Sequence, residues 1–180
     1  MCGIAGGWFS ADRSRLKNDM NQALEAMKFR GPNDHGAIFE ELTVGTVALG
    51  HTRLSIIDLS SGGHQPMNSA CGRYVIVFNG EIYNYLELKS ELKTLGVVFT
   101  SSSDTEVLLA AWIQWGRDCL TKIVGMFAFV VFDRSDQTLT CVRDAFGIKP
   151  LFFSQESSRF VFGSELRALK TIKAEVCELN

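Results

Sequence analysis

The segment from Phe127 to Phe132, Phe-Ala-Phe-Val-Val-Phe, constrains the fold most, because every one of its residues is apolar. Aromatic and β-branched residues favour a β-strand, and successive side chains of a strand point to opposite faces of its sheet. A strand that is apolar on both faces has to be covered on both sides. We therefore expect a sandwich of two stacked sheets with helices outside.

The rest of the sequence predicts a single α+β domain over residues 1–180. Runs rich in β-branched or aromatic residues predict the strands Ile4–Phe9, Val44–Arg53, Tyr74–Phe78, Phe127–Asp133, Leu139–Arg143, Leu151–Ser154 and Phe160–Phe162. Apolar residues at helical spacing predict helices over 16–27, 85–95, 104–115 and 166–170. Asp104 is a good N-cap for the third of these helices, and 133–136 reads as a hairpin-like turn.

Composition and charge exclude several classes of function. A net charge of -2 gives no field that attracts nucleic acid or an anionic membrane. The first ten residues are not expected to be a signal peptide, because they carry no basic region and no long apolar run. No run elsewhere approaches the roughly 20 apolar residues that span a bilayer. We therefore expect a cytoplasmic protein with neither nucleic-acid nor membrane partners. Its three histidines do not cluster and no CxxC pair occurs, so we expect no metal site. The five cysteines are Cys2, Cys71, Cys119, Cys141 and Cys177.

Cys2 differs from the other cysteines because it follows the initiator methionine and precedes Gly3. Removal of Met1 would leave Cys2 with both a thiol and a free α-amino group. The unperturbed pKa of such an amine is roughly 7.7–8.0, so it can act as general base for the thiol of its own residue. The alternatives are an ordinary chain start, or a self-cleaving or redox thiol. The lack of a second cysteine nearby argues against redox chemistry.

Polar residues that suit an acyl-transfer site follow two of the predicted strands. Asn79 offers a side-chain amide and Gly80 an N–H without a neighbouring Cβ, which together could stabilise an oxyanion. Arg53 can bind a carboxylate through two parallel N–H bonds, and Asp104 can pair with an ammonium group. The alternatives are a simple Asn-Gly turn, a surface arginine and a helix cap.

Taken together, these residues resemble the class II glutamine amidotransferases, and within them the asparagine synthetases. The resemblance covers nearly the whole chain in the family's order. Its motifs are Met1-Cys2-Gly3-Ile4, Arg30-Gly31-Pro32, Arg53-Leu54-Ser55-Ile56-Ile57-Asp58-Leu59, Gly63-His64-Gln65-Pro66-Met67, Asn79-Gly80-Glu81-Ile82-Tyr83-Asn84, Ser103-Asp104-Thr105-Glu106, Gly125-Met126-Phe127-Ala128-Phe129, Arg143-Asp144, Gly147-Ile148-Lys149-Pro150-Leu151 and Gly163-Ser164-Glu165. Asn33 departs from it, because the family usually has Asp directly after Arg-Gly-Pro.

The resemblance implies a four-layer αββα sandwich of the N-terminal-nucleophile hydrolase type. It also implies an enzyme that hydrolyses L-glutamine to L-glutamate and ammonia through a thioester, with no cofactor in this domain. The matching site residues are the nucleophile Cys2, the oxyanion-hole pair Asn79 and Gly80, and the glutamine-binding residues Arg53, Ile56, Ile57, Glu81 and Asp104.

Asparagine synthetases also contain an ATP-dependent domain, and its Ser-Gly-Gly-x-Asp-Ser pyrophosphate loop does not occur in this sequence. The resemblance implies ATP and Mg only for that domain, which would activate the acceptor of the ammonia, with asparagine as the expected product. The expected partners are L-glutamine and a synthetase domain, either C-terminal in the same parent chain or on a separate protein. A homodimer is left open. The alternative function is a non-catalytic regulatory or docking domain with the same fold.

Overall fold

The computed structural model describes residues 1–10 and 15–173, so Cys177 lies outside the described residues. Two antiparallel sheets form the centre of the molecule. The five-stranded sheet has the order β2-β3-β1-β9-β8, with β1 Gly3–Phe9, β2 Asp34–Leu42, β3 Gly45–Arg53, β8 Phe152–Glu156 and β9 Arg159–Gly163. The four-stranded sheet has the order β4-β5-β6-β7, with β4 Met67–Asn68, β5 Tyr74–Ile82, β6 Gly125–Asp133 and β7 Thr138–Arg143.

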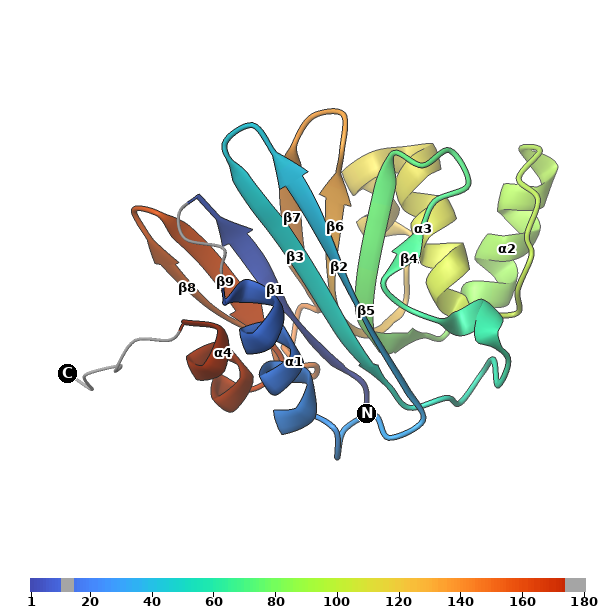
Figure 1. Ribbon diagram of the computed structural model, residues 1–180. Coiled ribbons are helices and arrows are strands. Elements are labelled where there is room, and N and C mark those ends of the chain that lie inside the picture. The colour runs from blue at the N-terminus through green and yellow to red at the C-terminus, as the bar shows by residue number, and fades with distance from the viewer. Residues whose placement is uncertain (11–14, 174–180) are drawn as a thin grey trace.

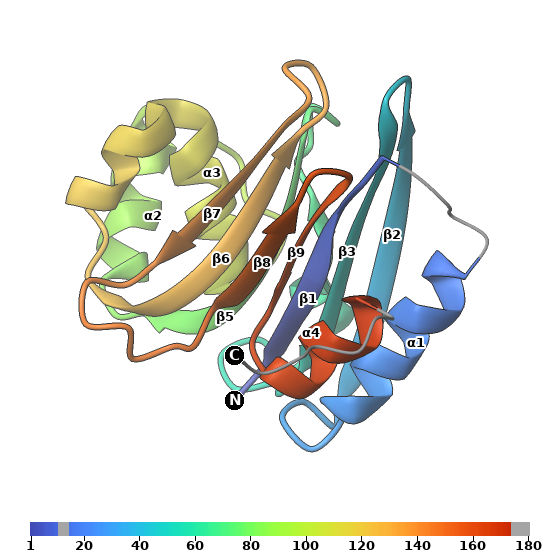
Figure 2. The same ribbon diagram turned by 90° about the vertical axis from the view of Figure 1, so that its left-hand side faces the viewer.

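Helices cover the outer face of each sheet, which gives the four layers of an αββα sandwich (Figures 1 and 2). Helices α1 (Leu16–Ala26) and α4 (Leu166–Lys173) lie on the five-stranded sheet, and α2 (Tyr85–Thr94) and α3 (Asp104–Trp115) lie on the four-stranded one. Two 3₁₀ helices, η1 (Ser61–Gly63) and η2 (Gly116–Thr121), complete the elements of the described chain. No helix in the described ranges has the length and apolar character needed to cross a bilayer.

Strand β6 confirms the prediction made from its apolar sequence. Its odd-numbered residues Phe127, Phe129 and Val131 join the core between the four-stranded sheet and its helices. The even-numbered residues Ala128, Val130 and Phe132 join the core between the two sheets. Because the side chains of a strand alternate between faces, this one strand contributes to two hydrophobic layers at once.

Strand β5 is longer than predicted. It was expected to end at Phe78, but it continues to Ile82, and Gly80 pairs with Phe127 of β6. Asn79 and Gly80 therefore lie within a strand, which makes the turn interpretation of this dipeptide wrong. The long hydrogen-bonded ladder with β6 outweighs the turn preference of Asn-Gly.

Two further expectations need correction. The N-cap of α3 is Ser103, whose Oγ accepts a hydrogen bond from the Thr105 N–H (3.1 Å), and Asp104 is the first residue of the helix. Strand β2 was not predicted. It is an edge strand with acidic residues and an exposed or half-buried pattern throughout, so it lacks the apolar signal of the inner strands.

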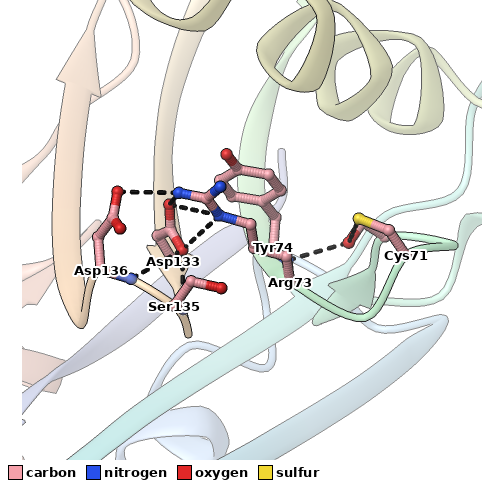
Figure 3. A network of polar contacts seen from close by, with 7 residues as sticks. Cys71, Arg73, Tyr74, Asp133, Ser135 and Asp136 are labelled. Atoms are coloured by element: carbon pink, nitrogen blue, oxygen red, sulfur yellow. Dashed lines mark hydrogen bonds and ion pairs between the residues drawn. The ribbon is translucent and has the colours of Figure 1, made fainter.

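Ion pairs stabilise the end of the sandwich where β5 begins and β6 ends (Figure 3). The Arg73 guanidinium donates to both carboxylate oxygens of Asp133 (2.7–3.0 Å) and to Asp136 at 2.8 Å. On the adjoining turn, Arg134 Nη2 donates to Glu40 of β2 at 2.5 Å, which links the two sheets. These contacts lie at the opposite end of β5 from Gly80.

Candidate active site

A cavity of about 340 Å³ lies where β1 begins and where β3 and β5 end. Both sheets contribute to its wall, together with the loop after β3, the start of α3 and the loop after β7. All of the site residues predicted from the sequence line this one cavity, namely Cys2, Arg53, Ile56, Ile57, Asn79, Gly80, Glu81 and Asp104. Residues spread over about a hundred positions of the chain are thus brought together by the sandwich.

The Cys2 thiol lies at the start of β1, beside the loop that leaves β3. The Leu54 N–H points at Cys2 Sγ over 3.4 Å, and Arg30 Nε donates to the Cys2 carbonyl oxygen at 2.9 Å. Burial raises the pKa of the thiol, while the Leu54 contact, the N-terminal amine and Arg53 oppose that rise. A buried thiol of raised pKa needs a base close by before it can act as a nucleophile.

Arg53 is buried and held in one orientation by the loop that follows β3. Its Nη1 donates to the Ser60 carbonyl at 2.7 Å, and its Nη2 donates to the Asp58 carbonyl. The Asp58 carboxylate in turn accepts from the Ser60 hydroxyl and N–H and from the Ser102 N–H, and these bonds lower its pKa to about 2. A guanidinium has more donors than these two bonds use, so others remain for a ligand in the cavity.

Asp104 places a carboxylate in the cavity at the start of α3. Its Oδ2 accepts a hydrogen bond from the Ile82 N–H at 3.1 Å. Burial raises the pKa of Asp104 to about 6, and the nearby charge of Glu81 acts in the same direction. A carboxylate that is costly to ionise in the empty site favours a cationic ligand, because an opposite charge stabilises the ionised form.

The free edge of β5 presents its backbone groups to the cavity. In an antiparallel strand, alternate residues point their N–H groups to opposite edges. On the edge away from β6, Ile76 pairs with β4, the Phe78 N–H donates to Gln65 Oε1, and the Ile82 N–H donates to Asp104. The Gly80 N–H belongs to the same series, so it points away from β6, toward the cavity that Gly80 lines. It is therefore placed to donate to a ligand.

The side chain of Asn79 supplies a second donor. Asn79 is almost fully buried and lines the cavity, yet its Nδ2 has no hydrogen-bond partner in the part of the chain that the structure describes. Leaving a buried amide unpaired costs about 1–3 kcal/mol, so such a group points to a ligand. Gly80 is required beside it, because a Cβ there would stand 2.4 Å from the Met126 carbonyl oxygen.

Several residues of the site were missed from the sequence. Gln65 and Asp58 lie in the cavity wall and occur in the quoted motifs, but no role was predicted for them. His51 lies behind the wall and donates to the Phe78 carbonyl. Side chains two residues apart lie on the same face of a strand. The position of His51 two residues before Arg53 could therefore have indicated that both side chains lie on the same side of β3. Lys149, from the loop after β7, is a further buried lining residue.

Comparisons with known proteins match the chain over its full length. Residues 1–180 match the family model described as a glutamine amidotransferase domain. The chain is 40% identical to glutamine-hydrolyzing asparagine synthetase 3 of Bacillus subtilis, covering 98% of this chain and 29% of that protein. It is 36% identical to the putative glutamine-hydrolyzing asparagine synthetase 2 of Methanocaldococcus jannaschii, covering 96% and 36%. The chain thus spans about a third of the length of these relatives.

Solved structures show the same fold at low sequence identity. The glutamine phosphoribosylpyrophosphate amidotransferase of B. subtilis superposes with a TM-score of 0.75 at 22% identity, covering 96% of this chain and 44% of that chain. The structure described as the allosteric regulatory enzyme of purine biosynthesis gives 0.76 at 23% identity, covering 96% and 43%. These likenesses confirm the four-layer αββα sandwich that was expected from the sequence.

Proposed function

Since this chain belongs to the glutamine amidotransferase family, we propose that it hydrolyses L-glutamine to L-glutamate and ammonia with Cys2 as nucleophile. The observation that carries the proposal is the set of side chains that line one cavity. A thiol, an unpartnered amide donor, a buried guanidinium and a buried carboxylate all line it. Glutamine presents an electrophilic carbonyl, a carboxylate and an ammonium group, and this set offers each of them a partner.

The reaction starts from Cys2 after removal of Met1. The α-amine of Cys2 accepts the proton of the thiol, and the sulfur attacks the γ-carbonyl carbon of glutamine to form a C–S bond. The same proton is then delivered to the leaving nitrogen, the C–N bond breaks, and ammonia departs. Water adds to the resulting thioester, the C–S bond breaks, and glutamate leaves with the thiol restored.

Both steps pass through an oxyanion, which Asn79 and Gly80 are placed to stabilise. The Asn79 Nδ2 has no partner within the described residues, and the Gly80 N–H points to the same cavity by the alternation along β5. Removing one such donor typically costs about 10²–10³-fold in kcat. Both donors belong to β5, whose ladder with β6 holds them rigid.

The remaining predicted site residues suit the amino-acid end of the substrate. Arg53 would bind the α-carboxylate, and Asp104 together with Glu81 would bind the α-ammonium group. Ile56 and Ile57 line the same cavity, and their backbone groups would contact the substrate. The raised pKa of Asp104 supports this assignment, because the ammonium group of the substrate would relieve the cost of ionising it.

The use of the ammonia is a further part of the proposal. The relatives named asparagine synthetases are about three times as long as this chain. We propose that a synthetase domain, in the same parent chain or in a partner protein, receives the ammonia and adds it to a carboxylate activated with ATP and Mg, giving asparagine. A cytoplasmic location stays a prediction of the sequence.

The proposal is tested by ammonia release from L-glutamine, combined with intact-mass analysis of the active protein. We expect the active form to lack Met1, a glutamyl adduct to appear on Cys2, and Cys2→Ala to abolish turnover. The matched control is Cys71→Ala, which alters an exposed cysteine outside the cavity and should retain wild-type activity. Full activity in Cys2→Ala would refute the mechanism. Retained Met1 without any adduct would favour the non-catalytic docking domain.

A further inference from the structure

Phe78 is the residue of β5 whose backbone is held by two side chains from other elements. His51 Nε2 lies 3.0 Å from the Phe78 carbonyl oxygen, and the Phe78 N–H donates to Gln65 Oε1 at 2.6 Å. Both side chains are buried, His51 completely. These two hydrogen bonds, called the Phe78 contacts below, occupy the free edge of β5 next to Asn79 and Gly80.

The hydrogen bond to the Phe78 carbonyl determines which ring nitrogen of His51 carries the proton. A carbonyl oxygen can only accept, so His51 carries its proton on Nε2. Burial lowers the pKa of His51 to about 3, so the ring is neutral and Nδ1 carries no hydrogen. That Nδ1 has no partner within the described residues. A buried acceptor left unpaired lowers stability, so the placement of this histidine calls for a reason other than stability.

Gln65 connects the same edge to the substrate-binding side of the cavity. Its Oε1 accepts from Phe78, and its Nε2 donates to Thr105 Oγ1 at 3.2 Å. Thr105 follows Asp104, whose Oδ2 accepts from the Ile82 N–H. The N–H groups on either side of Gly80 in this alternating series are therefore both bound by side chains, and the Gly80 N–H between them faces the cavity.

We propose that His51 and Gln65 are positioning residues for glutamine hydrolysis. They hold the Phe78 peptide groups in place and so fix the direction in which the adjoining Asn79 amide and Gly80 N–H point. The inference rests on the proposed function of the cavity. It predicts that the Phe78 contacts act on the rate of the chemical step, because an oxyanion donor contributes mainly in the transition state. Neither residue touches substrate in this assignment.

The test compares His51→Leu with His51→Gln in the full chain. Leucine removes the N–H donor, whereas glutamine places an amide N–H near the position of Nε2. We expect His51→Leu to lower kcat for glutamine about tenfold to hundredfold, since a small misplacement of catalytic groups can cost that much. The KM for glutamine should change little, and His51→Gln should recover most of kcat. The matched control is His35→Leu, an exposed histidine outside the cavity, which should behave as wild type.

Gln65→Met provides an independent variant of the second contact, and it decides the question if His51→Leu does not fold. Thermal unfolding first establishes that each variant is folded. A fall in kcat at nearly constant KM supports the proposal. An unchanged kcat, a rise in KM alone, or the absence of rescue in a folded His51→Gln overturns it.

The wild-type protein separates this inference from the proposed function. If mass spectrometry finds no glutamyl thioester on wild-type Cys2, the proposed function fails. If the thioester forms and ammonia is released, but the folded His51 and Gln65 variants keep the wild-type kcat, only the positioning roles fail.

Discussion

Gly63 lies directly against the guanidinium of Arg53, so that a Cβ at position 63 would stand 2.1 Å from Arg53 Nη2. Real Cβ atoms do not come so close to another heavy atom, so any side chain there must displace the guanidinium. The displacement would break the bonds from Arg53 to the Ser60 and Asp58 carbonyls. The absence of a side chain at Gly63 thus allows Arg53 to keep the orientation that these two hydrogen bonds fix.

Gly63→Ala is therefore expected to weaken glutamine binding and leave the chemistry intact. A charge-assisted hydrogen bond contributes about 1.5–3 kcal/mol, so the KM for glutamine should rise about tenfold or more, with kcat nearly unchanged. Initial rates of ammonia release over a range of glutamine concentrations measure both values. Gly163→Ala is the control, because a Cβ there meets its neighbours at 3.4 Å or more. A normal KM in Gly63→Ala would show that Arg53 does not bind the substrate.

Glutamine binding should depend on pH through Asp104. Because the pKa of this carboxyl is raised to about 6, the empty site gains a proton as the pH falls through that value. The protonated form cannot pair with the substrate ammonium, so we expect KM to rise below pH 6. Asp104→Asn should show a high KM that no longer varies with pH in this range. The exposed Asp118→Asn variant serves as control, and an unchanged KM profile in Asp104→Asn would contradict the assignment.

The same carboxyl is expected to reduce stability at neutral pH. Its pKa in the folded chain lies above the ordinary value of 3.8, so the folded state binds the proton more tightly than the unfolded state. Between these two pKa values the free energy of unfolding therefore falls as the pH rises. Asp104→Asn should unfold at a higher temperature than wild type at pH 8, and the difference should vanish near pH 3. Thermal unfolding followed by circular dichroism measures it, and a lower midpoint at pH 8 would refute the prediction.

Asn33, the one departure from the family motif, keeps the contact that an aspartate could make. Its Oδ1 accepts from the Ser55 N–H at 3.0 Å, which attaches the loop after β3 to the start of β2. Asn33→Asp retains an oxygen acceptor and should keep kcat/KM close to the wild-type value. Asn33→Ala removes the acceptor and should raise KM severalfold, since one neutral hydrogen bond contributes about 0.5–1.5 kcal/mol. Equal KM values for the two variants would show that the contact has no role in binding.

The inner parts of the fold were predictable because burial leaves a periodic signal in the sequence. The apolar run of β6 and the helical spacing of α3 predicted both elements and their buried faces. Strand β2 gave no such signal, since one edge strand with a half-exposed surface looks like a loop. The true end of β5 was hidden for another reason. Asn79 and Gly80 favour a turn locally, and only the pairing with β6, which no local pattern reports, extends the strand.

Candidate site residues could be chosen from the sequence where the side chain itself has a reactive or charged group. A cysteine at position two, an arginine at the end of a strand and an aspartate at the start of a helix were chosen for their chemistry, and all three line one cavity in the structure. Their roles in catalysis and binding stay predictions. His51 and Gln65 were missed because their partners are backbone groups of Phe78, far away in sequence. A sequence shows which side chains are present, but the backbone atoms that they contact are known only once the sheets are assembled.

The alternation of amides along β5 has a consequence for how mutations can inactivate this protein. The register between β5 and β6, in which Gly80 lies opposite Phe127, determines which backbone N–H of β5 points into the cavity. A shift of one position would turn the Gly80 amide toward β6 and present a neighbouring residue in its place. The same shift would turn the apolar side chains of β5 to the opposite faces of its sheet and disrupt both hydrophobic layers. A deletion or insertion that changes this register, even far from Cys2, is therefore expected to remove the oxyanion donor and destabilise the fold at the same time.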